Sequence, residues 1–283
     1  MAQKMNKVWL ITLVIILLWC SESPALFETE GLGARCLSLG GGCTAVSDQP
    51  SVMASNPAGL GFYQKRGVQL SWSQLFNLRE LSAGDLYFAY HPGRIYSIDG
   101  LTLGLGLSLF GQSDYYQEAK ILFSFGYRIK NRLSLGISVK YMRVSFPSPY
   151  SSLSAIGFDC GMLIRVQDKI QIGAAVKNLN KPEMITGSED VPRIWDLGAA
   201  LYPFEEVILV IDWVKDSQFE HQLKFGQEIK VLKRLALRFG VGTEPVTYGW
   251  GTGFEWQRMK IDYALLSHPT LGASHMFTFS LEW

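Results

Sequence analysis

Apolar and polar residues alternate along most of the chain, from about residue 67 to its end. In one stretch, Leu103, Leu105, Leu107 and Leu109 alternate with small or polar residues. The same period of two runs through residues 121–128, 133–141, 170–176 and 235–241. A helix would instead place apolar residues three and four positions apart. The pattern therefore predicts β-strands that have one apolar face and one face of small and polar residues.

Counting these segments predicts an all-β protein with about 14 strands of roughly ten residues, the length that a tilted strand needs to cross a bilayer. The expected spans are 67–74, 84–91, 101–110, 119–129, 132–144, 154–166, 170–178, 194–202, 206–214, 220–230, 233–242, 246–256, 258–267 and 273–283. Turns at 130–131, 167–169, 231–232 and 257 are short, whereas the connections 146–153 and 179–192 are long. Short turns on one side and long loops on the other are typical of a transmembrane antiparallel β-barrel.

The composition agrees with a barrel whose apolar residues are dispersed. The 283 residues are 48% hydrophobic and 18% charged. After the N-terminus, no stretch approaches the 18 consecutive apolar residues that indicate a membrane-spanning helix. The formal net charge of +1 gives no reason to expect a nucleic-acid partner.

Residues 1–25 have the pattern of a secretory signal peptide. Lys4 and Lys7 precede an unbroken apolar stretch from Val8 to Trp19, which is too short to span a bilayer. Ser23 and Ala25 are small residues at the positions that a signal peptidase reads, so cleavage is expected before Leu26. Lipoprotein processing at Cys20 is the alternative, but Trp19 stands where such a site requires a small residue.

The face of the strands opposite the apolar one is rich in glycine and carries charges of both signs. A glycine inside a strand often marks the close approach of another backbone, although it can also serve barrel curvature. The glycines are Gly104, Gly106, Gly126, Gly136, Gly157, Gly161, Gly173, Gly198, Gly226, Gly240, Gly249, Gly251 and Gly253. The charges are Asp85, Lys140, Asp159, Arg165, Lys177, Asp196, Asp212, Lys224, Glu228, Arg238, Glu255, Lys260 and Asp262. Charges toward lipid are costly, so this face is predicted to line the lumen, with room for a plug.

The last predicted strand resembles the signal by which the barrel-assembly machinery recognises outer-membrane proteins. Phe277, Phe279, Leu281 and Trp283 put apolar side chains on one face, and the last residue is aromatic. Trp195, Trp213, Trp256 and Trp283 fall near predicted strand ends, where aromatic girdles are expected.

Residues 26–63 do not alternate and are predicted to form a compact hatch inside the barrel, which would occupy residues 64–283. Asp48 is expected to cap a short helix that has Pro50 in its first turn. That helix should end before Asn56-Pro57, because proline disfavours helical geometry at the preceding residue. Gly59 and Gly61 would then release the chain into the first strand.

Both ends of the predicted mature chain resemble the PorV/PorQ family of outer-membrane proteins, relatives of the FadL long-chain fatty acid transporters. The opening pattern runs from Gly33-Ala34-Arg35 through Gly40, Gly41 and Gly42 to Asn56-Pro57-Ala58-Gly59-Leu60, and the closing one from Asp262 to His275. The resemblance implies a 14-stranded barrel with an N-terminal hatch in its lumen. Fatty acid transporters carry large outer loops that bind substrate, and the short loops of this chain depart from that pattern.

Cysteines are a second departure from the family, which has small or apolar residues at the positions of Cys36 and Cys43. The two lie seven positions apart and could form a disulfide in an oxidising compartment, or could simply be two small buried residues. Cys160 falls on the apolar face of its strand and is expected to face lipid.

No pattern in the chain indicates an enzyme, a metal site or a cofactor. The weak exception is His268 and His275, which flank the last predicted outer loop with Ser267 and Ser274 beside them. A hydrolase would need a nucleophile, a base and an orienting group together. The family resemblance assigns the same residues to a hairpin without catalysis, so we predict no enzymatic activity.

The sequence thus leads to two functional hypotheses for a protein of the outer membrane of a diderm bacterium. The first is a hatch-plugged barrel for passive uptake of small hydrophobic molecules. The alternative is a PorV-like accessory protein of type IX secretion that binds cargo or secretion components. Expected partners in either case are outer-membrane lipid and, during insertion, the barrel-assembly machinery.

Overall fold

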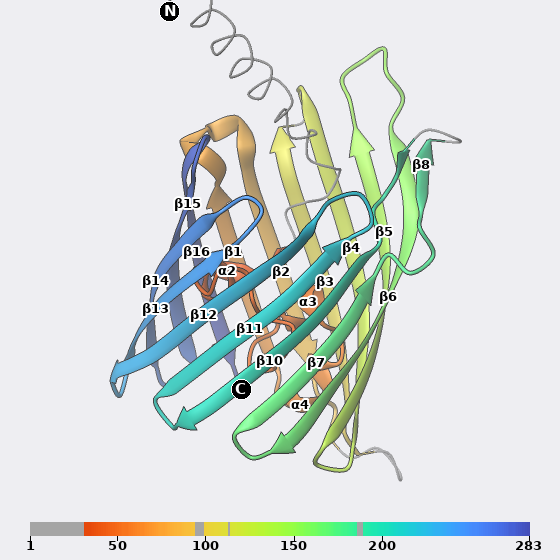
Figure 1. The fold of residues 1–283 in the computed structure, drawn as a ribbon. Coiled ribbons are helices and arrows are strands. Elements are labelled where there is room, and N and C mark those ends of the chain that lie inside the picture. Colours follow the sequence, from red (N-terminus) through yellow and green to blue (C-terminus); the bar gives the residue numbers. More distant parts are fainter. Residues whose placement is uncertain (1–30, 94–98, 113, 186–188) are drawn as a thin grey trace, which may run out of the picture.

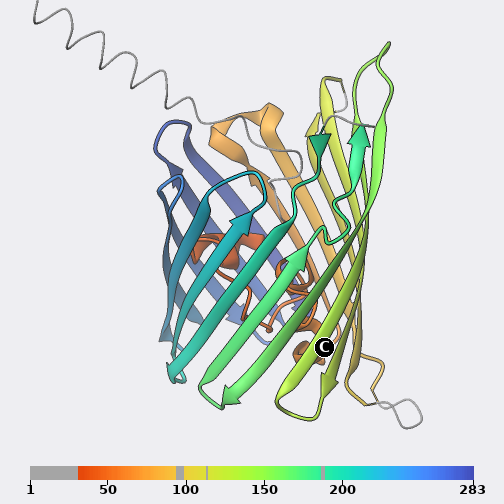
Figure 2. The same cartoon turned by 45° about the vertical axis from the view of Figure 1, so that its right-hand side comes forward.

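A computed structural model describes residues 31–93, 99–112, 114–185 and 189–283 (Figures 1 and 2). The predicted signal peptide, Cys20 and the first residues of the predicted hatch lie outside these ranges. Strands form a closed antiparallel barrel in the order β1-β16-β15-β14-β13-β12-β11-β10-β7-β6-β5-β4-β3-β2. The predicted all-β transmembrane barrel of 14 strands is therefore confirmed.

The observed strand boundaries fall within three residues of the predicted spans. The barrel strands are β1 (Gly67–Gln74), β2 (Ser82–Tyr90), β3 (Leu101–Gln112), β4 (Tyr116–Ile129), β5 (Leu133–Ser145), β6 (Leu153–Gln167), β7 (Ile170–Lys177), β10 (Ile194–Phe204), β11 (Val207–Asp216), β12 (His221–Leu232), β13 (Leu235–Gly242), β14 (Thr247–Trp256), β15 (Met259–His268) and β16 (Gly272–Glu282). Two short 3-10 helices, η1 (Leu75–Asn77) and η2 (Arg79–Leu81), connect β1 to β2. The connection 179–192, predicted as a plain loop, contains a small hairpin of β8 (Glu183–Ile185) and β9 (Glu189–Asp190).

The alternation of apolar and polar residues in the sequence corresponds to side chains that point alternately out of and into the barrel. Along β5 the burial alternates residue by residue, and outward side chains such as Ile137 and Phe123 are more than half exposed. These residues form an apolar belt around the barrel, as expected for a wall that faces lipid. Within the described ranges, no helix is long and apolar enough to cross a membrane.

The two rims of the barrel differ in their connections. Four of the shortest turns, at 168–169, 205–206, 233–234 and 257–258, lie on the rim where β1 begins and β16 ends, which we call the turn end. The opposite rim, the loop end, carries the long connections 146–152 and 178–193. The expected sorting of loops is present, with one exception, the ten-residue connection 91–100 at the turn end.

Strand β16 closes the barrel by pairing with both β15 and β1. Its outward residues Phe277, Phe279 and Leu281 lie opposite Trp72, Leu70 and Val68 of β1. Ring centroids of Trp72 and Phe277 are 6.4 Å apart. The residues of the predicted assembly signal thus lie on the lipid face of the closing strand.

Removing this aromatic edge is expected to reduce assembly. Deleting Trp283 together with Phe279→Ala should leave most of the protein unfolded in the periplasm, because the insertion machinery would lack its signal and β1 its apolar partners. Heat-modifiable migration in electrophoresis of membrane fractions measures the folded share. Leu237→Ala, an equally outward residue of β13, is the control. An undiminished folded share in the membrane would contradict the prediction.

The described part of the N-terminal segment lies inside the barrel, as predicted (Figure 2), and residues 31–63 contain three short helices. These are α2 (Gly33–Ser38), α3 (Val52–Ser55) and α4 (Gly59–Tyr63). Only α3 was expected, and its start was predicted wrongly. Its N-cap is Ser51 rather than Asp48, because the Asp48 carboxylate binds Arg35. Ser51 forms no side-chain cap hydrogen bond. Gly59 and Gly61 also do not release the chain into β1, since both belong to α4.

Candidate functional site: the hatch and its seat

We use "hatch" for residues 31–63, the part of the predicted plug that the structure describes. Its helices and loops are buried almost throughout, and they pack into two apolar clusters. One includes Leu39, Val46 and Ala58 of the hatch with Leu163 and Val210 of the wall. The other includes Met53 and Leu60 with Tyr87 and Leu122. Apolar burial therefore holds the hatch in place along much of its length.

The glycine face of the wall is the seat of the hatch. A side chain built on these glycines would collide with hatch atoms, most often with its backbone. The glycines and their hatch neighbours are Gly104 with Met53 and Leu60, Gly126 with Leu60 and Gly61, Gly136 with Pro57 and Ala58, Gly161 with Asn56, Gly173 and Gly198 with Thr44, Gly226 with Leu39, Gly240 with Leu39 and Gly40, and Gly249 and Gly251 with Leu37 and Ser38. The predicted close approach of a plug to the glycine face is confirmed at these positions, on nine strands.

A methyl group on this seat is expected to loosen the hatch. In Gly240→Ala the new Cβ would overlap the backbone of Leu39 and Gly40, which cannot move without lifting that loop. Gly84→Ala is the control, because nothing lies within 4 Å of a Cβ built there. We expect trypsin to cut after the buried Arg35 several-fold faster in Gly240→Ala only. Equal cleavage of both variants would show that the seat tolerates the added volume.

One cluster of charges, buried except for Asp48, ties the hatch to the wall. Arg35 of α2 donates to Glu228 of β12 through Nε (2.7 Å) and Nη2 (3.1 Å), and it also binds Asp48. Glu228 accepts a further bond from Arg238 of β13 (2.5 Å), which reaches Asp262 of β15 (2.6 Å). We call these five residues the latch.

The latch neutralises charges that burial would otherwise penalise. Burial lowers the pKa of Arg35, but the carboxylates of Asp48 and Glu228 raise that pKa more, to well above its ordinary value. The guanidinium therefore stays charged at any physiological pH. Loss of one partner of such a buried pair leaves the other charge uncompensated, which typically costs several kcal/mol.

Asn56 fastens the hatch at a second point, on β6, which is separated from β12 by three strands of the wall. Its Nδ2 donates to the carbonyl oxygens of Thr44 in the hatch (2.9 Å) and Met162 in β6 (3.2 Å). Its Oδ1 accepts from the backbone N of Ala58, across the Pro57 turn (3.0 Å). Ser134 of β5 donates to the carbonyl of Ala58 (2.6 Å). The motif that the sequence singled out, Asn56 to Gly59, thus lies against β5 and β6.

The three consecutive glycines, Gly40, Gly41 and Gly42, form the turn after α2 and pass close to β11, β12 and β13. Gly40 and Gly41 have φ of 71° and 81°, which disfavours other residues there. A Cβ on Gly40 would also collide with the backbone of Val241. Both the close approach and the backbone conformation therefore require glycine at this turn.

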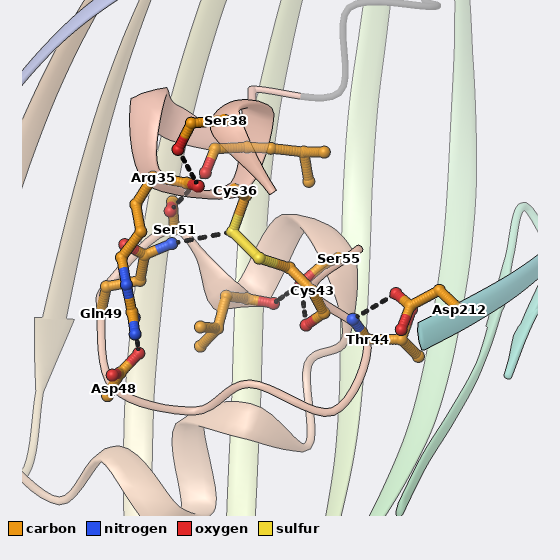
Figure 3. Close-up of a disulfide and its surroundings, with 12 residues drawn as sticks. Arg35, Cys36, Ser38, Cys43, Thr44, Asp48, Gln49, Ser51, Ser55 and Asp212 are labelled. Carbon is orange, nitrogen blue, oxygen red and sulfur yellow. Dashed lines mark hydrogen bonds and ion pairs between the residues drawn. A yellow bond between two sulfur atoms is a disulfide. The ribbon is translucent and has the colours of Figure 1, made fainter. Parts of the chain in front are cut away.

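Cys36 and Cys43 form a disulfide across this turn (Figure 3). The sequence left the bridge and two free thiols as alternatives, and the structure has the bridge. Gln49 donates through Nε2 to Cys36 Sγ (3.0 Å), and the neighbouring Thr44 donates its backbone N to Asp212 of β11 (2.8 Å) (Figure 3). Cys160 is a free, partly exposed thiol on the lipid side, as expected.

The disulfide is expected to hold the glycine turn rather than the barrel. Without reductant, a maleimide in denaturant should label only Cys160 of these three thiols. The double variant Cys36→Ser and Cys43→Ser should keep the folded barrel but expose Arg35 to trypsin, because the turn at Gly40 loses its covalent closure. Labelling of Cys36 and Cys43 without reductant would contradict the bridge.

Elsewhere in the lumen, opposite charges pair along neighbouring strands. Lys140 Nζ lies 2.8 Å from Asp159 Oδ1, and Lys177 Nζ lies 2.9 Å from Asp196 Oδ2. Arg165 lies over the ring of Phe62, with 3.9 Å from its Cζ to the centroid. These predicted lumen charges therefore face inward and pair with each other or contact the hatch.

Below the latch, the turn end of the lumen opens into a polar vestibule with a volume of about 240 Å³. Arg35 and Glu228 form part of its inner wall, and Glu255, Lys260 and Tyr202 also line it. At the loop end, the lumen wall is apolar beside β5 and β6, whereas inward residues of other strands there, such as Ser73 and Glu118, are polar. Met142, Val144 and Ala155 pack there under Met184 and Val191 of the 178–193 connection. The apolar part of the loop end is thus confined to one side of the barrel.

The weak catalytic candidates are used in local contacts. His268 Nδ1 accepts from the backbone N of Thr270 and Leu271, and His275 Nδ1 pairs with the hydroxyl of Tyr263 (2.8 Å). Ser274 Oγ accepts from the backbone N of Phe76. Among the described residues, no hydrogen bond joins a serine to either histidine. The arrangement offers no activated nucleophile.

Comparison with known proteins identifies the fold. No protein family profile matches the chain, and no curated protein matches it by sequence. Among solved structures, the Ralstonia pickettii toluene transporter TbuX is similar with a TM-score of 0.65 and 15% identity over 91% of this chain and 98% of that one. The CymD monoaromatic hydrocarbon channel is similar with a TM-score of 0.66 and 13% identity, over 90% of this chain and 97% of that one. A Pseudomonas aeruginosa FadL homologue has a TM-score of 0.60 and 14% identity, over 90% of this chain and 98% of that one.

These similarities show that the chain has the FadL-like barrel fold. The relation to FadL that the sequence suggested is thereby confirmed at the level of fold. The finer resemblance to PorV/PorQ proteins stays a prediction. The sequence did not anticipate the latch, although a signal was present. Arg35 is a single charge within an otherwise uncharged stretch from Gly31 to Ser47. If that stretch is buried, the charge of Arg35 requires a partner.

Proposed function

We propose that this protein is a passive channel of the outer membrane through which small hydrophobic molecules pass, and that the hatch controls the passage. The carrying observation is a lumen closed by a segment of the same chain, seated on a glycine wall and held by one ion-pair cluster. The contacts between the hatch and the wall can break and form again without unfolding the barrel. The named activities of TbuX and CymD, toluene transport and a monoaromatic hydrocarbon channel, support the choice of ligand class.

The apolar cluster at the loop end is the proposed entrance. Met184 and Val191 are buried against Met142 and Val144, although they come from a connection between strands. A small apolar molecule could take their place with little loss of contact, because it would bury the same wall. Entry would then proceed by displacement of the 178–193 connection.

The polar vestibule makes a straight exit into the periplasm unfavourable for such a molecule, so a lateral exit is proposed. The wall is weakest beside the loop half of β6. Pairing of β6 with β7 begins only at Cys160, and residues 153–159 have no strand partner on that side. Asn180 takes the place of a strand there, since its Oδ1 accepts from Phe158 N (3.0 Å) and its Nδ2 donates to Ile156 O (2.8 Å). Opening this seam needs these two side-chain bonds and one backbone bond, from Leu179 N to Phe158 O (2.8 Å), to break.

Uptake by whole cells tests the proposal. The protein is expressed in a diderm host without hydrocarbon channels, and entry of labelled toluene at low concentration is compared with entry of a sugar. We expect faster toluene uptake with no change for the sugar. Met184→Gln, which adds a polar group to the entrance, should reduce uptake several-fold, whereas the exposed Lys181→Gln on the same connection should not. Toluene uptake no faster than in cells without the protein would refute the channel.

A further inference from the structure

Several basic side chains come together on one arc of the turn end. Glu255 N donates to the carbonyl of Arg234 and Glu282 N to that of Arg258, both at 2.9 Å. Arg66 and Trp283 exchange backbone hydrogen bonds (3.2 and 2.9 Å). Arg234, Arg258 and Arg66 are therefore carried by neighbouring strand ends from β12 round to β1.

This arc also has the aromatic residues of a membrane interface. Trp256 and Trp283 stand at the ends of outward rows of β14 and β16, and they are 48% and 49% exposed. The guanidinium carbon of Arg66 lies 4.8 Å from the ring centroid of Tyr90, which belongs to the outward row of β2. Tryptophan, tyrosine and arginine at this level are typical of the headgroup region.

The cations of the arc have no acidic partners. Lys233, Arg234, Arg258 and Arg66 are exposed, and none forms an ion pair with another described residue. The nearby Glu282 is buried and already binds Lys65 and Lys260. Glu255 is exposed and follows the inward row of β14, and it lines the vestibule, as do the nearby Lys233 and Arg234.

Three basic residues at the loop end are instead used within their own connections. Arg143 donates to Ser152, Arg193 to the carbonyl of Leu179, and Lys215 to that of Phe219. Arg79 and Lys181 are exposed at the loop end too, but they lie on separate connections, 75–81 and 178–193.

We infer that this arc, Lys233, Arg234, Arg258 and Arg66 with Trp256 and Trp283, binds the phosphate of anionic phospholipids in the periplasmic leaflet. Arginine forms paired, charge-assisted bonds to phosphate, and each surface cation attracts anionic lipid independently of the others. The inference rests on the proposed outer-membrane location, but not on transport. The lipid would fix the depth and tilt of the β12–β1 side of the barrel.

Native mass spectrometry of the full protein tests this site. The protein is incubated with phosphatidylglycerol or phosphatidylcholine of the same acyl chains, and lipid retention is compared. We expect preferential retention of phosphatidylglycerol, lowered roughly fivefold for each cation removed. The triple variant Lys233→Gln, Arg234→Gln, Arg258→Gln should lose the preference, and higher salt should weaken it in the unchanged protein.

The matched control removes the same charge from the other rim, as Arg79→Gln, Arg143→Gln, Lys181→Gln. It should keep the preference for phosphatidylglycerol. Heat-modifiable migration verifies that each variant is folded, and Arg66→Gln alone serves if the triple variant is not. Equal loss of the preference in both triple variants would show that it depends on net charge alone, and would contradict a specific site. Unchanged retention in the turn-end variants would also overturn it, and would direct attention to an acidic protein partner instead.

Discussion

Deletion of residues 31–58 is expected to convert the protein into an open, ion-conducting pore. The glycine seat would then face an empty lumen, and the wall charges paired along β5 to β10 would keep one another neutral. A barrel of this strand number is wide enough for water once its plug is gone. Single-channel conductance in planar bilayers should rise by an order of magnitude or more over the intact protein.

The deletion keeps α4 and the segment that leads into β1, so the barrel can still close through β16. Heat-modifiable migration is the check that the variant has folded. A folded deletion variant that conducts no more than the intact protein would show that the hatch is not the barrier. The partner-binding hypothesis would then become the better explanation of this fold.

Replacement of Arg35 by glutamine is expected to release the hatch without removing it. Glu228 would keep Arg238 but lose both bonds from Arg35, and Asp48 would lose its buried partner. Breaking a buried pair costs about 3–5 kcal/mol, enough to unseat a local segment but less than the stability of most barrels. Bilayer recordings should show frequent brief openings that the intact protein lacks.

Lys140→Gln is the matched control for this variant, because it breaks a buried lumen ion pair that holds no hatch residue. Asn56→Ala should have a smaller effect of the same kind, since three neutral hydrogen bonds are lost at a cost of about 1–3 kcal/mol. Openings that are equally frequent in Lys140→Gln would attribute the effect to the wall rather than to the latch.

The strands could be predicted from the sequence because each barrel strand faces two different environments. The leucines from Leu103 to Leu109 face lipid, and the small residues between them face the lumen that holds the hatch. The glycine face predicted a plug for the same reason, since a backbone can approach Gly136 or Gly240 only where no Cβ intervenes. Local sequence was sufficient for both features.

The interior of the hatch could not be predicted in the same way. The side-chain oxygen of Asp48 was available as a helix cap, but the Arg35 guanidinium competes for it, and Arg35 is placed there by contacts with β12, far away in sequence. The helices α2 and α4 are only six and five residues long, and they exist because the wall confines them. Short helices of this kind have little stability of their own, so propensity gives no signal for them.

A reversible tether between the hatch and the wall tests whether movement of the hatch controls passage. A Cβ built on Gly42 would lie 3.6 Å from Cβ of Lys224 in β12, within the range of a disulfide. Gly42→Cys with Lys224→Cys is combined with serine at Cys36, Cys43 and Cys160, so that only the new pair can bridge. Toluene uptake by whole cells is then measured before and after dithiothreitol, with the Gly42→Cys single variant as control. We expect little uptake while the tether is closed, recovery of uptake on reduction and no response to dithiothreitol in the control. Equal uptake in the closed and open states would show that the molecule passes without movement of this part of the hatch, and would contradict the claim that the hatch controls passage.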